Sequence, residues 1–321
     1  MRFAFVMDPI ERILPDKDTT FTFMLESGRR GHEVYYLCAD DMWLERSVPY
    51  ARVRRAEVMR PTADDPAHYR LFEERETRLD WFDVVFMRKD PPFDMAFFFA
   101  THLLSLIDPA RTLVVNDPRG LRDANEKLYA LNFPDVIPPS LVTSDRARLK
   151  RFMEELGGEM IIKPLDGAGG AGVFHLHHGD RNLNAILESA TDYGRRPLMA
   201  QRYLAEIRQG DKRVVVLDGE PLGAVLRVPR DDETRGNIHA GGATVQSPVN
   251  DRDRAICARL APRLRRDGLW FVGLDVIGDW LTEVNVTSPT GIQEINALDG
   301  VALERTVIDF VEQRASALSR G

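Results

Sequence analysis

Two acidic residues and an asparagine near the end of the chain have the spacing of a metal site. Asp275, Glu283 and Asn285 lie in residues 273–286, which read as two apolar strands joined by a turn. If residues 278–280 form a three-residue hairpin loop, Asp275 faces Glu283, and alternation places Asn285 on the same face. The two carboxylates would repel each other without a cation, and oxygen ligands favour Mg²⁺ or Mn²⁺. The sequence therefore predicts a magnesium or manganese site.

The register of this hairpin is a structural test of the metal site. A three-residue loop also pairs Ile277 with Leu281. A two-residue turn would shift the register by one residue and separate Asp275 from Glu283. The alternative is a solvated polar face, which does not explain why polar residues recur at alternate positions of an apolar strand.

A glycine-rich loop between two predicted strands has the composition of a phosphate site. The loop spans residues 166–172, and its glycines are Gly167, Gly169, Gly170 and Gly172. Bare glycine amides can lie against phosphate oxygens, and Lys163, half-buried in the preceding strand, needs an anionic partner. A flexible turn is the alternative reading. The Walker spacing is absent, so the loop is not a P-loop.

Four arginines indicate a small ligand with several negative charges. Arg88 follows an apolar strand, at the edge where parallel sheets bind ligands, and Arg213 and Arg227 lie within apolar strands. Arg235 lies in residues 229–242, a polar loop with three glycines that could close over a site. A guanidinium binds carboxylate or phosphate through a planar fork. Structural salt bridges are the alternative for each arginine taken singly.

Three histidines form the only histidine cluster in the sequence. Alternation makes His175 and His177 neighbours on one face of a strand, with His178 beside them. They are a possible metal pair, but without a third ligand nearby a surface strand edge is favoured. No serine has a nucleophile elbow, so hydrolase triad chemistry is not indicated.

The elements that position the first part of the chain alternate strand and helix. Strands are predicted at residues 3–7, 33–37, 82–87 and 112–116, with a helix at 19–30. Strand, helix and strand in this order predict a parallel sheet with a right-handed crossover, and the continuous apolar runs predict that both faces are covered.

Two further segments of the first part restrict the interpretation. The turn after the first strand, residues 7–11, contains no glycine, which argues against a nicotinamide or flavin cofactor. Residues 61–66 and 73–78 read as solvated loop and helix surface, to which we assign no function.

Beyond a boundary near residue 120, short strands and turns predict a mixed α+β domain. Helices are expected at residues 125–132 and 145–156 around a proline-rich crossing at 134–139. The predicted strands span residues 160–164, 172–175, 198–201, 213–217, 221–228, 270–277 and 281–286.

Composition restricts the class of protein and its partners. The chain has 321 residues and a net charge of -7, so no basic field draws it to nucleic acid or to an anionic membrane. Its two cysteines, Cys38 and Cys257, fit a reducing compartment. The apolar run at residues 3–7 is too short for a signal peptide or membrane span. We therefore expect a cytoplasmic protein.

Several segments resemble the bacterial glutathione synthetases of the ATP-grasp superfamily, in the same order along nearly the whole chain. They lie at residues 6–9, 87–94, 125–127, 163–167, 210–213, 233–237, 240–242 and 283–289. The resemblance implies an α/β fold in three parts. A parallel-sheet pre-ATP-grasp domain would span residues 1–122, a central lid subdomain 123–203, and a catalytic subdomain 204–321 with the metal hairpin and a mobile loop at 229–242.

The resemblance also implies roles for individual residues. Those implied for ATP are Lys127, Lys163, Gly167, Gly169, Gly170, Gly172, Gln201, Arg202, Tyr203, Leu204 and Asp211, with the two lysines on the phosphates and residues 201–204 reading adenine. Asp275, Glu283 and Asn285 would bind two metal ions, bridged by Glu283. Those implied for the dipeptide or the transferred phosphoryl group are Arg88, Arg213, Arg227, Arg235 and Ser288, with Arg213 and Arg235 acting in catalysis.

The family reaction joins γ-glutamylcysteine and glycine into glutathione, with ATP converted to ADP and phosphate through an acylphosphate. The resemblance further implies a homotetramer. Two rival functions stay open at the level of sequence: another ATP-grasp carboxylate–amine ligase, and a nucleotide-binding interaction protein without turnover. Both lysines and all three candidate metal ligands are retained, which argues against the second rival.

Overall fold

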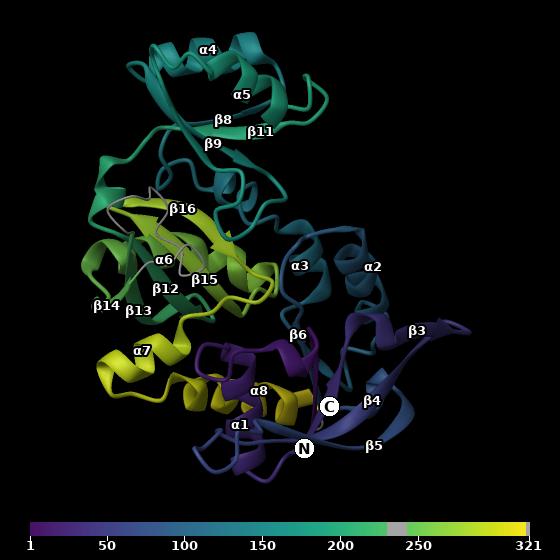
Figure 1. Ribbon diagram of the computed structural model, residues 1–321. Coiled ribbons are helices and arrows are strands. Elements are labelled where there is room, and N and C mark those ends of the chain that lie inside the picture. The colour runs from purple at the N-terminus through teal and green to yellow at the C-terminus, as the bar shows by residue number, and fades with distance from the viewer. Residues whose placement is uncertain (230–242, 319–321) are drawn as a thin grey trace.

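The computed structural model describes residues 1–229 and 243–318, and these form three sheets, each covered by helices (Figure 1). The sheets have seven, four and five strands among the described residues. Arg235 and the rest of residues 230–242 lie outside the described residues. No helix in the described part is both long and apolar enough to cross a bilayer.

The first sheet has a parallel centre, as the sequence predicts. Its central strands are β1 (Arg2–Met7), β2 (Glu33–Leu37), β6 (Val84–Arg88) and β7 (Leu113–Val115), and β1 runs parallel to both β2 and β6. Helix α1 (Thr19–Arg29) begins at Asp18, whose carboxylate accepts a hydrogen bond from Phe21 N at 2.7 Å. Such an N-cap satisfies one of the free amides of the first turn.

Helices cover both faces of this sheet, which accounts for its unbroken apolar strands. One face packs against α2 (Met95–Leu104) and α3 (Pro118–Asp123), and the other against α1 and α8 (Leu303–Leu318). Helix α8 reaches this sheet from the far end of the chain (Figure 1), where Val307 and Val311 join the cluster of Phe3 and Phe5. Arg30 at the end of α1 binds Asp309 and Glu312 of α8 at 2.6 and 2.7 Å.

An antiparallel ribbon extends the first sheet, and one prediction fails there. It comprises β3 (Met42–Glu45), β4 (Val48–Val58) and β5 (Tyr69–Arg78). Residues 73–78, predicted as solvated loop and helix surface, belong to β5, although residues 61–66 are loop as expected. Most side chains of β5 face water, and charged pairs such as Arg54–Glu74 at 2.9 Å replace the apolar alternation that marks a strand.

Helices cover the outer face of the second sheet (Figure 1), and we call this sheet with its helices the lid. Its elements are β8 (Ser140–Thr143), α4 (Arg146–Glu155), β9 (Glu159–Pro164), β10 (Phe174–His177), α5 (Leu183–Ala190) and β11 (Leu198–Gln201). Met160 and Ile162 of β9 pack with Leu149 and Leu187 of the helices. Because side chains alternate along a strand, the residues between them face the third sheet.

The helix predicted at residues 125–132 is wrong. Only a single 3₁₀ turn forms, at Tyr129–Asn132, and α3 ends before it. The Asn125 side chain accepts hydrogen bonds from the amides of Lys127 and Leu128, each at 3.1 Å, which stabilises a turn in place of a helix. The helix predicted at 145–156 is confirmed as α4.

The third sheet is antiparallel and carries the predicted metal hairpin. Its strands are β12 (Asp211–Leu217), β13 (Glu220–Val228), β14 (Ala243–Gln246), β15 (Phe271–Ile277) and β16 (Trp280–Asn285). Helix α6 (Asp251–Arg266) packs on one face, and α7 (Ile292–Asp299) lies against β13 and β14.

Candidate active site

The hairpin brings Asp275 opposite Glu283, as predicted, but its turn and register differ from the predicted ones. The turn has two residues, so Ile277 pairs with Trp280, and the predicted three-residue loop is wrong. The register then shifts between Asp275 and Val276, leaving Thr282 as an extra residue in β16. This β-bulge restores the pairing of Asp275 with Glu283.

Asn285 lies near the same carboxylates. It pairs with Gly273, and its Nδ2 donates to Asp275 Oδ2 at 3.2 Å. The three predicted metal-ligating side chains therefore come from adjacent strands of one hairpin. Two carboxylates and an amide supply oxygen donors of the kind that Mg²⁺ and Mn²⁺ prefer.

Two buried arginines neutralise Asp275. Arg213 Nε lies 2.6 Å from Asp275 Oδ1, and Arg227 Nη2 lies 3.0 Å from the same oxygen. Burial opposes the charge on Asp275, but these guanidiniums hold the pKa of the carboxyl well below its usual range. The ion pairs left open as the alternative reading of Arg213 and Arg227 are therefore present.

Asp211 shares the guanidinium of Arg227 at 2.5 Å. Burial raises the pKa of Asp211 to about 6, against the opposing charge of Arg227. Asp211 Oδ1 is buried and has no hydrogen-bond partner among the described residues. A buried acceptor without a donor is costly, so this oxygen is suited to meet a ligand.

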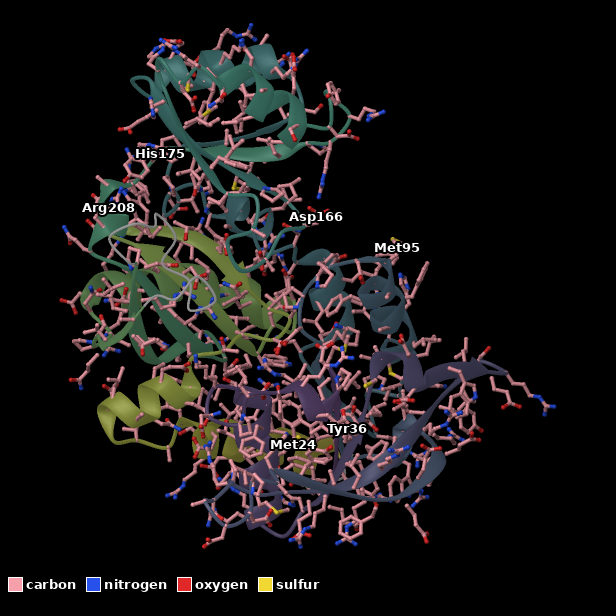
Figure 2. All side chains as sticks on the ribbon, in the orientation of Figure 1. Met24, Tyr36, Met95, Asp166, His175 and Arg208 are labelled. Atoms are coloured by element: carbon pink, nitrogen blue, oxygen red, sulfur yellow. The ribbon has the colours of Figure 1, made fainter. Side chains whose placement is uncertain are left out.

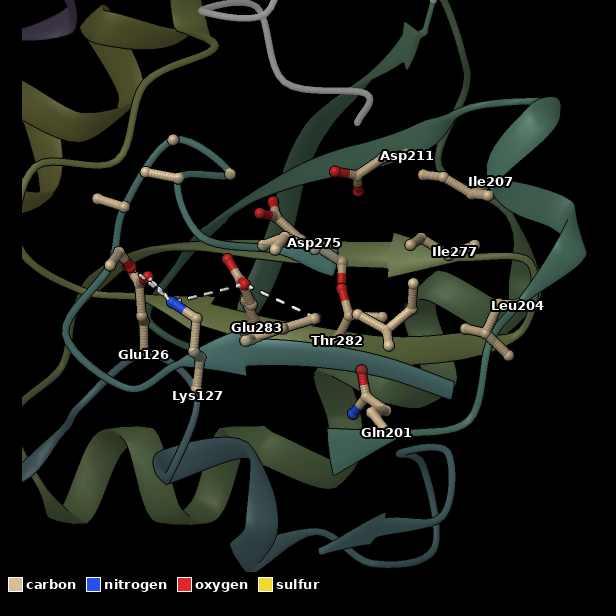
Figure 3. Close-up of a pocket in the computed structure, with 18 of the residues that line it drawn as sticks. Glu126, Lys127, Gln201, Leu204, Ile207, Asp211, Asp275, Ile277, Thr282 and Glu283 are labelled. Carbon is tan, nitrogen blue, oxygen red and sulfur yellow. Dashed lines mark hydrogen bonds and ion pairs between the residues drawn. The ribbon is translucent and has the colours of Figure 1, made fainter. Parts of the chain in front are cut away.

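Two lysines converge on Glu283. The Nζ atoms of Lys127 and Lys163 lie 3.7 and 3.8 Å from Glu283 Oε1, and both lysines are buried. Burial opposes the charge on Lys127, but Glu283 and Glu126 raise its pKa above the ordinary lysine value. Figure 3 shows the ion pairs of Lys127 with Glu126 and Glu283 at one end of the pocket.

The sequence analysis did not assign Glu126 a role. Its carboxylate binds the Nζ of Lys127, and burial raises its pKa, with a further rise from the charge of Glu283. Glu126 directly precedes Lys127 and lies in residues 125–127, one of the segments that resemble the family, and these were its signals in the sequence.

A cavity that is open to solvent lies between the lid and the third sheet. The predicted residues that line it are Lys127, Lys163, Gly167, Gly169, Gly170, Gln201, Arg202, Tyr203, Leu204, Asp211, Asp275 and Glu283. The predicted residues of the described part that do not line it are Gly172, Asn285, Arg88, Arg213, Arg227 and Ser288. The cavity thus brings together nearly all of the residues expected to hold ATP.

The cavity is apolar at one end and charged at the other (Figure 3). Leu204, Ile207 and Ile277 line the apolar end beside Gln201, whose Nε2 donates to Ser140 Oγ at 2.9 Å. Lys127 lies at the opposite end. An apolar slot suits a base, and buried cations suit phosphates.

The glycine loop requires glycine at several positions. Gly169 and Gly170 have φ angles of 62° and 79°, which side chains disfavour. A Cβ at Gly167 would lie 2.6 Å from Pro164 Cγ. The Gly167 carbonyl accepts a hydrogen bond from Lys127 Nζ at 2.7 Å, which ties the loop to the charged end of the cavity.

Arg88 lies in the core between the first and third sheets. Its Nε donates to Thr20 Oγ1 at 3.1 Å and its Nη2 to Pro289 O at 2.9 Å. Burial lowers the pKa of Arg88 to about 10. Gln293 adds a parallel link, since its Nε2 donates to Asp18 O at 2.6 Å. These contacts fix the segment around Ser288 against β6 and the start of α1.

The histidine cluster lies at a surface strand edge, which is the interpretation that the sequence favoured over a metal pair. His175 pairs with Glu159 and His178 with Glu154, so the rings bind different carboxylates. Strand β10, which carries His175 and His177, is the edge of the lid sheet. Within residues 1–229 and 243–318, no three His, Cys, Asp or Glu side chains are grouped so that they could hold a metal ion.

The chain has the ATP-grasp fold. The D-cycloserine synthetase DcsG has the same fold, with a TM-score of 0.65 at 16% identity, over 99% of this chain and 100% of that one. The ATP-grasp ligase PsnB, solved with a precursor peptide and AMPPNP, gives 0.62 at 17% identity, over 98% of each chain.

Family models and close relatives define the particular family. Residues 1–122 match the N-terminal domain of prokaryotic glutathione synthetase, and residues 126–300 match its ATP-grasp domain. The glutathione synthetase of Gloeobacter violaceus is 47% identical over 100% of this chain and 99% of its own length. That of Brucella melitensis is 46% identical over 98% and 99%. The chain belongs to the prokaryotic glutathione synthetases, which are ATP-dependent ligases.

Proposed function

We propose that this chain joins the cysteinyl carboxylate of γ-glutamylcysteine to the amine of glycine, with ATP converted to ADP and phosphate. The observation that carries the proposal is the convergence of Lys127 and Lys163 on Glu283 at the charged end of a cavity whose other end is apolar. A carboxylate is a poor electrophile, so it first receives the γ-phosphoryl group as an acylphosphate. The glycine amine then attacks, and phosphate leaves.

The apolar end and the charged end of the cavity determine how the nucleotide is oriented in it. The base lies at the apolar end, against residues 201–204, and the phosphates lie at Lys127, Lys163 and the glycine loop. These groups contribute by positioning and by neutralising charge on the transferred group, which is what phosphoryl transfer requires.

We propose that Asp275, Glu283 and Asn285 would supply the oxygen donors for Mg²⁺ or Mn²⁺, with two ions held at the site. Their convergence and the oxygen-only donor set support this fit. Substrate phosphates would complete the ligand shell, since the protein offers few donors. Bound at these residues, the metal would neutralise charge on the transferring phosphoryl group.

The arginines bind the anionic groups of γ-glutamylcysteine, which is the acid that accepts the phosphoryl group. Arg213 and Arg227 lie beside Asp275, next to the cavity, and Arg88 fixes the segment that contains Ser288. We assign catalytic roles to Arg213 and to Arg235, the second of which lies outside the described residues.

Assembly and location complete the proposal. We propose a cytoplasmic homotetramer whose chain divides at residues 122 and 203, with α8 packed on the first part. Light scattering tests the assembly. Four chains per particle would support the homotetramer, and a monomer would contradict it.

The decisive experiment measures ADP production with γ-glutamylcysteine and glycine, omitting each in turn. We expect turnover only when both are present, and its loss in Lys163→Met. Lys150→Met, in α4 away from the cavity, is the matched control and should retain wild-type turnover. ATP turnover that does not depend on the dipeptide would contradict the proposal and favour another ligase. No turnover with any acceptor would favour a binding protein.

A further inference from the structure

The ring of Tyr203 lies flat on the imidazole of His175. Their centroids are 3.9 Å apart and their planes differ by 15°. Tyr203 lines the cavity beside Arg202 and Leu204, whereas His175 does not. His175 therefore supports the far face of a side chain that forms part of the cavity wall.

The register of the lid strands accounts for this position. His175 of β10 pairs with Ile161 of β9, and paired residues share one face of a sheet. Ile161 and Lys163 both line the cavity, so this face is the one that looks onto it. Figure 2 places His175 on the side of the lid that faces the third sheet.

A carboxylate of the neighbouring strand holds the imidazole in this position. Glu159 lies two residues before Ile161 on the same face of β9, and its Oε2 lies 3.0 Å from His175 Nε2. The His175 ring is thus bound at its edge by Glu159 and covered on one face by Tyr203. Two contacts of this kind fix the orientation of both rings.

We infer that His175 is a positioning residue for the nucleotide base, holding Tyr203 in place as the wall of the base-binding end of the cavity. An unsupported tyrosine would have to be ordered when the nucleotide binds, which weakens binding. The inference rests on the proposed nucleotide site. It concerns the base alone, because the phosphates meet the lysines at the other end.

The test measures binding of ADP and of inorganic tripolyphosphate by calorimetry, so that it does not depend on turnover. We expect His175→Ala to weaken ADP binding by about 3- to 10-fold, the range of an aromatic pair, and to leave tripolyphosphate binding unchanged. His175→Phe keeps a flat ring against Tyr203 but loses the bond to Glu159, so its ADP affinity should lie between those of the wild type and His175→Ala. His178→Ala is the control. His178 lies three residues from His175 in the sequence, but it pairs with Glu154 and does not line the cavity.

A double-mutant cycle checks the mechanism. If His175 acts only through Tyr203, His175→Ala has no further effect on ADP binding in a Tyr203→Ala chain. Unchanged ADP affinity in His175→Ala, an equal loss for tripolyphosphate, or additive losses in the double variant would each overturn the inference. Absence of glutathione synthesis in the wild type would contradict the proposed reaction but leave this test intact.

Discussion

Asp275 and Glu283 lie directly opposite one another across the β15–β16 ladder because Thr282 is an extra residue in β16. The Thr282 hydroxyl donates to the backbone oxygen of Asp275 at 3.1 Å, so the bulge is bonded to the strand that it re-aligns. Bulges near active sites redirect side chains in this way. The convergence of the carboxylates therefore depends on backbone geometry as well as on residue type.

Replacement of the carboxylate at the centre of the site should remove turnover without unfolding the chain. We expect Glu283→Gln to lower kcat by about 100-fold or more, because the variant loses the charge that Lys127 and Lys163 surround. Asp279→Asn, in the exposed turn of the same hairpin, should retain wild-type kcat. Steady-state ADP release measures both, and near-normal turnover in Glu283→Gln would refute this assignment.

Metal dependence should appear in stability as well as in turnover. We expect Mn²⁺ with ADP to raise the melting temperature of the wild type above that with ADP and EDTA, since ligands that bind only the folded state stabilise it. The increment should disappear in Asn285→Ala, which removes one oxygen donor. An equal increment in that variant would show that Asn285 is not a ligand.

Replacement of Arg88 should affect the stability of the fold and the binding of γ-glutamylcysteine, but not the binding of the nucleotide. It is buried, bonds to Thr20 and Pro289, and does not line the cavity. We expect Arg88→Met to lower the free energy of unfolding by about 2–3 kcal/mol and to raise KM for γ-glutamylcysteine. ADP affinity should stay unchanged. Denaturant unfolding, kinetics and calorimetry measure the three quantities, and a loss confined to ADP affinity would contradict the assignment.

The ion pairs of Glu26 with Arg29 and Arg30, at the end of α1, should make the stability of the fold depend on pH. A hydrogen bond from Arg29 lowers the pKa of Glu26 to about 2, against the effect of burial, and Arg30 adds to it. Because the folded-state pKa lies below the unfolded value, this stabilisation is present above about pH 4.5 and is lost as the pH falls towards 2. We expect Glu26→Gln to lower the free energy of unfolding by about 1–2 kcal/mol at pH 7, discounted because Arg29 is exposed.

The pH series supplies its own control. The difference in free energy of unfolding between wild type and Glu26→Gln should shrink as the pH falls through that window. A difference that stays constant from pH 7 to pH 3 would show that the charge of Glu26 does not stabilise the fold.

Much of the cavity lining was predictable because its parts are local in sequence. Lys163 leads directly into the glycine loop, and Gln201 begins the segment that lines the apolar end. The parallel strands were predictable as well, because burial on both faces leaves an unbroken apolar run.

The features that the sequence did not predict have three causes, which are contacts between distant strands, exposure to water, and side-chain bonds to the backbone. The pairing of Arg213 and Arg227 with Asp275 joins three strands, and no local pattern encodes it. The strand at Tyr69–Arg78 carries charge where a strand signal would be apolar, because water covers most of its side chains. The turn at Asn125 depends on side-chain bonds to the backbone that compete with a helix.

The return of α8 to the first sheet has a consequence for the order of folding during synthesis. Strands β1 and β2 leave the ribosome first, yet Phe3 and Phe5 pack against Val307 and Val311. Helix α1 covers only part of this face, so the rest of it stays uncovered until residues 303–318 have been made. An exposed apolar sheet face is a site for aggregation or chaperone binding, so the nascent chain is vulnerable there until α8 packs on the sheet.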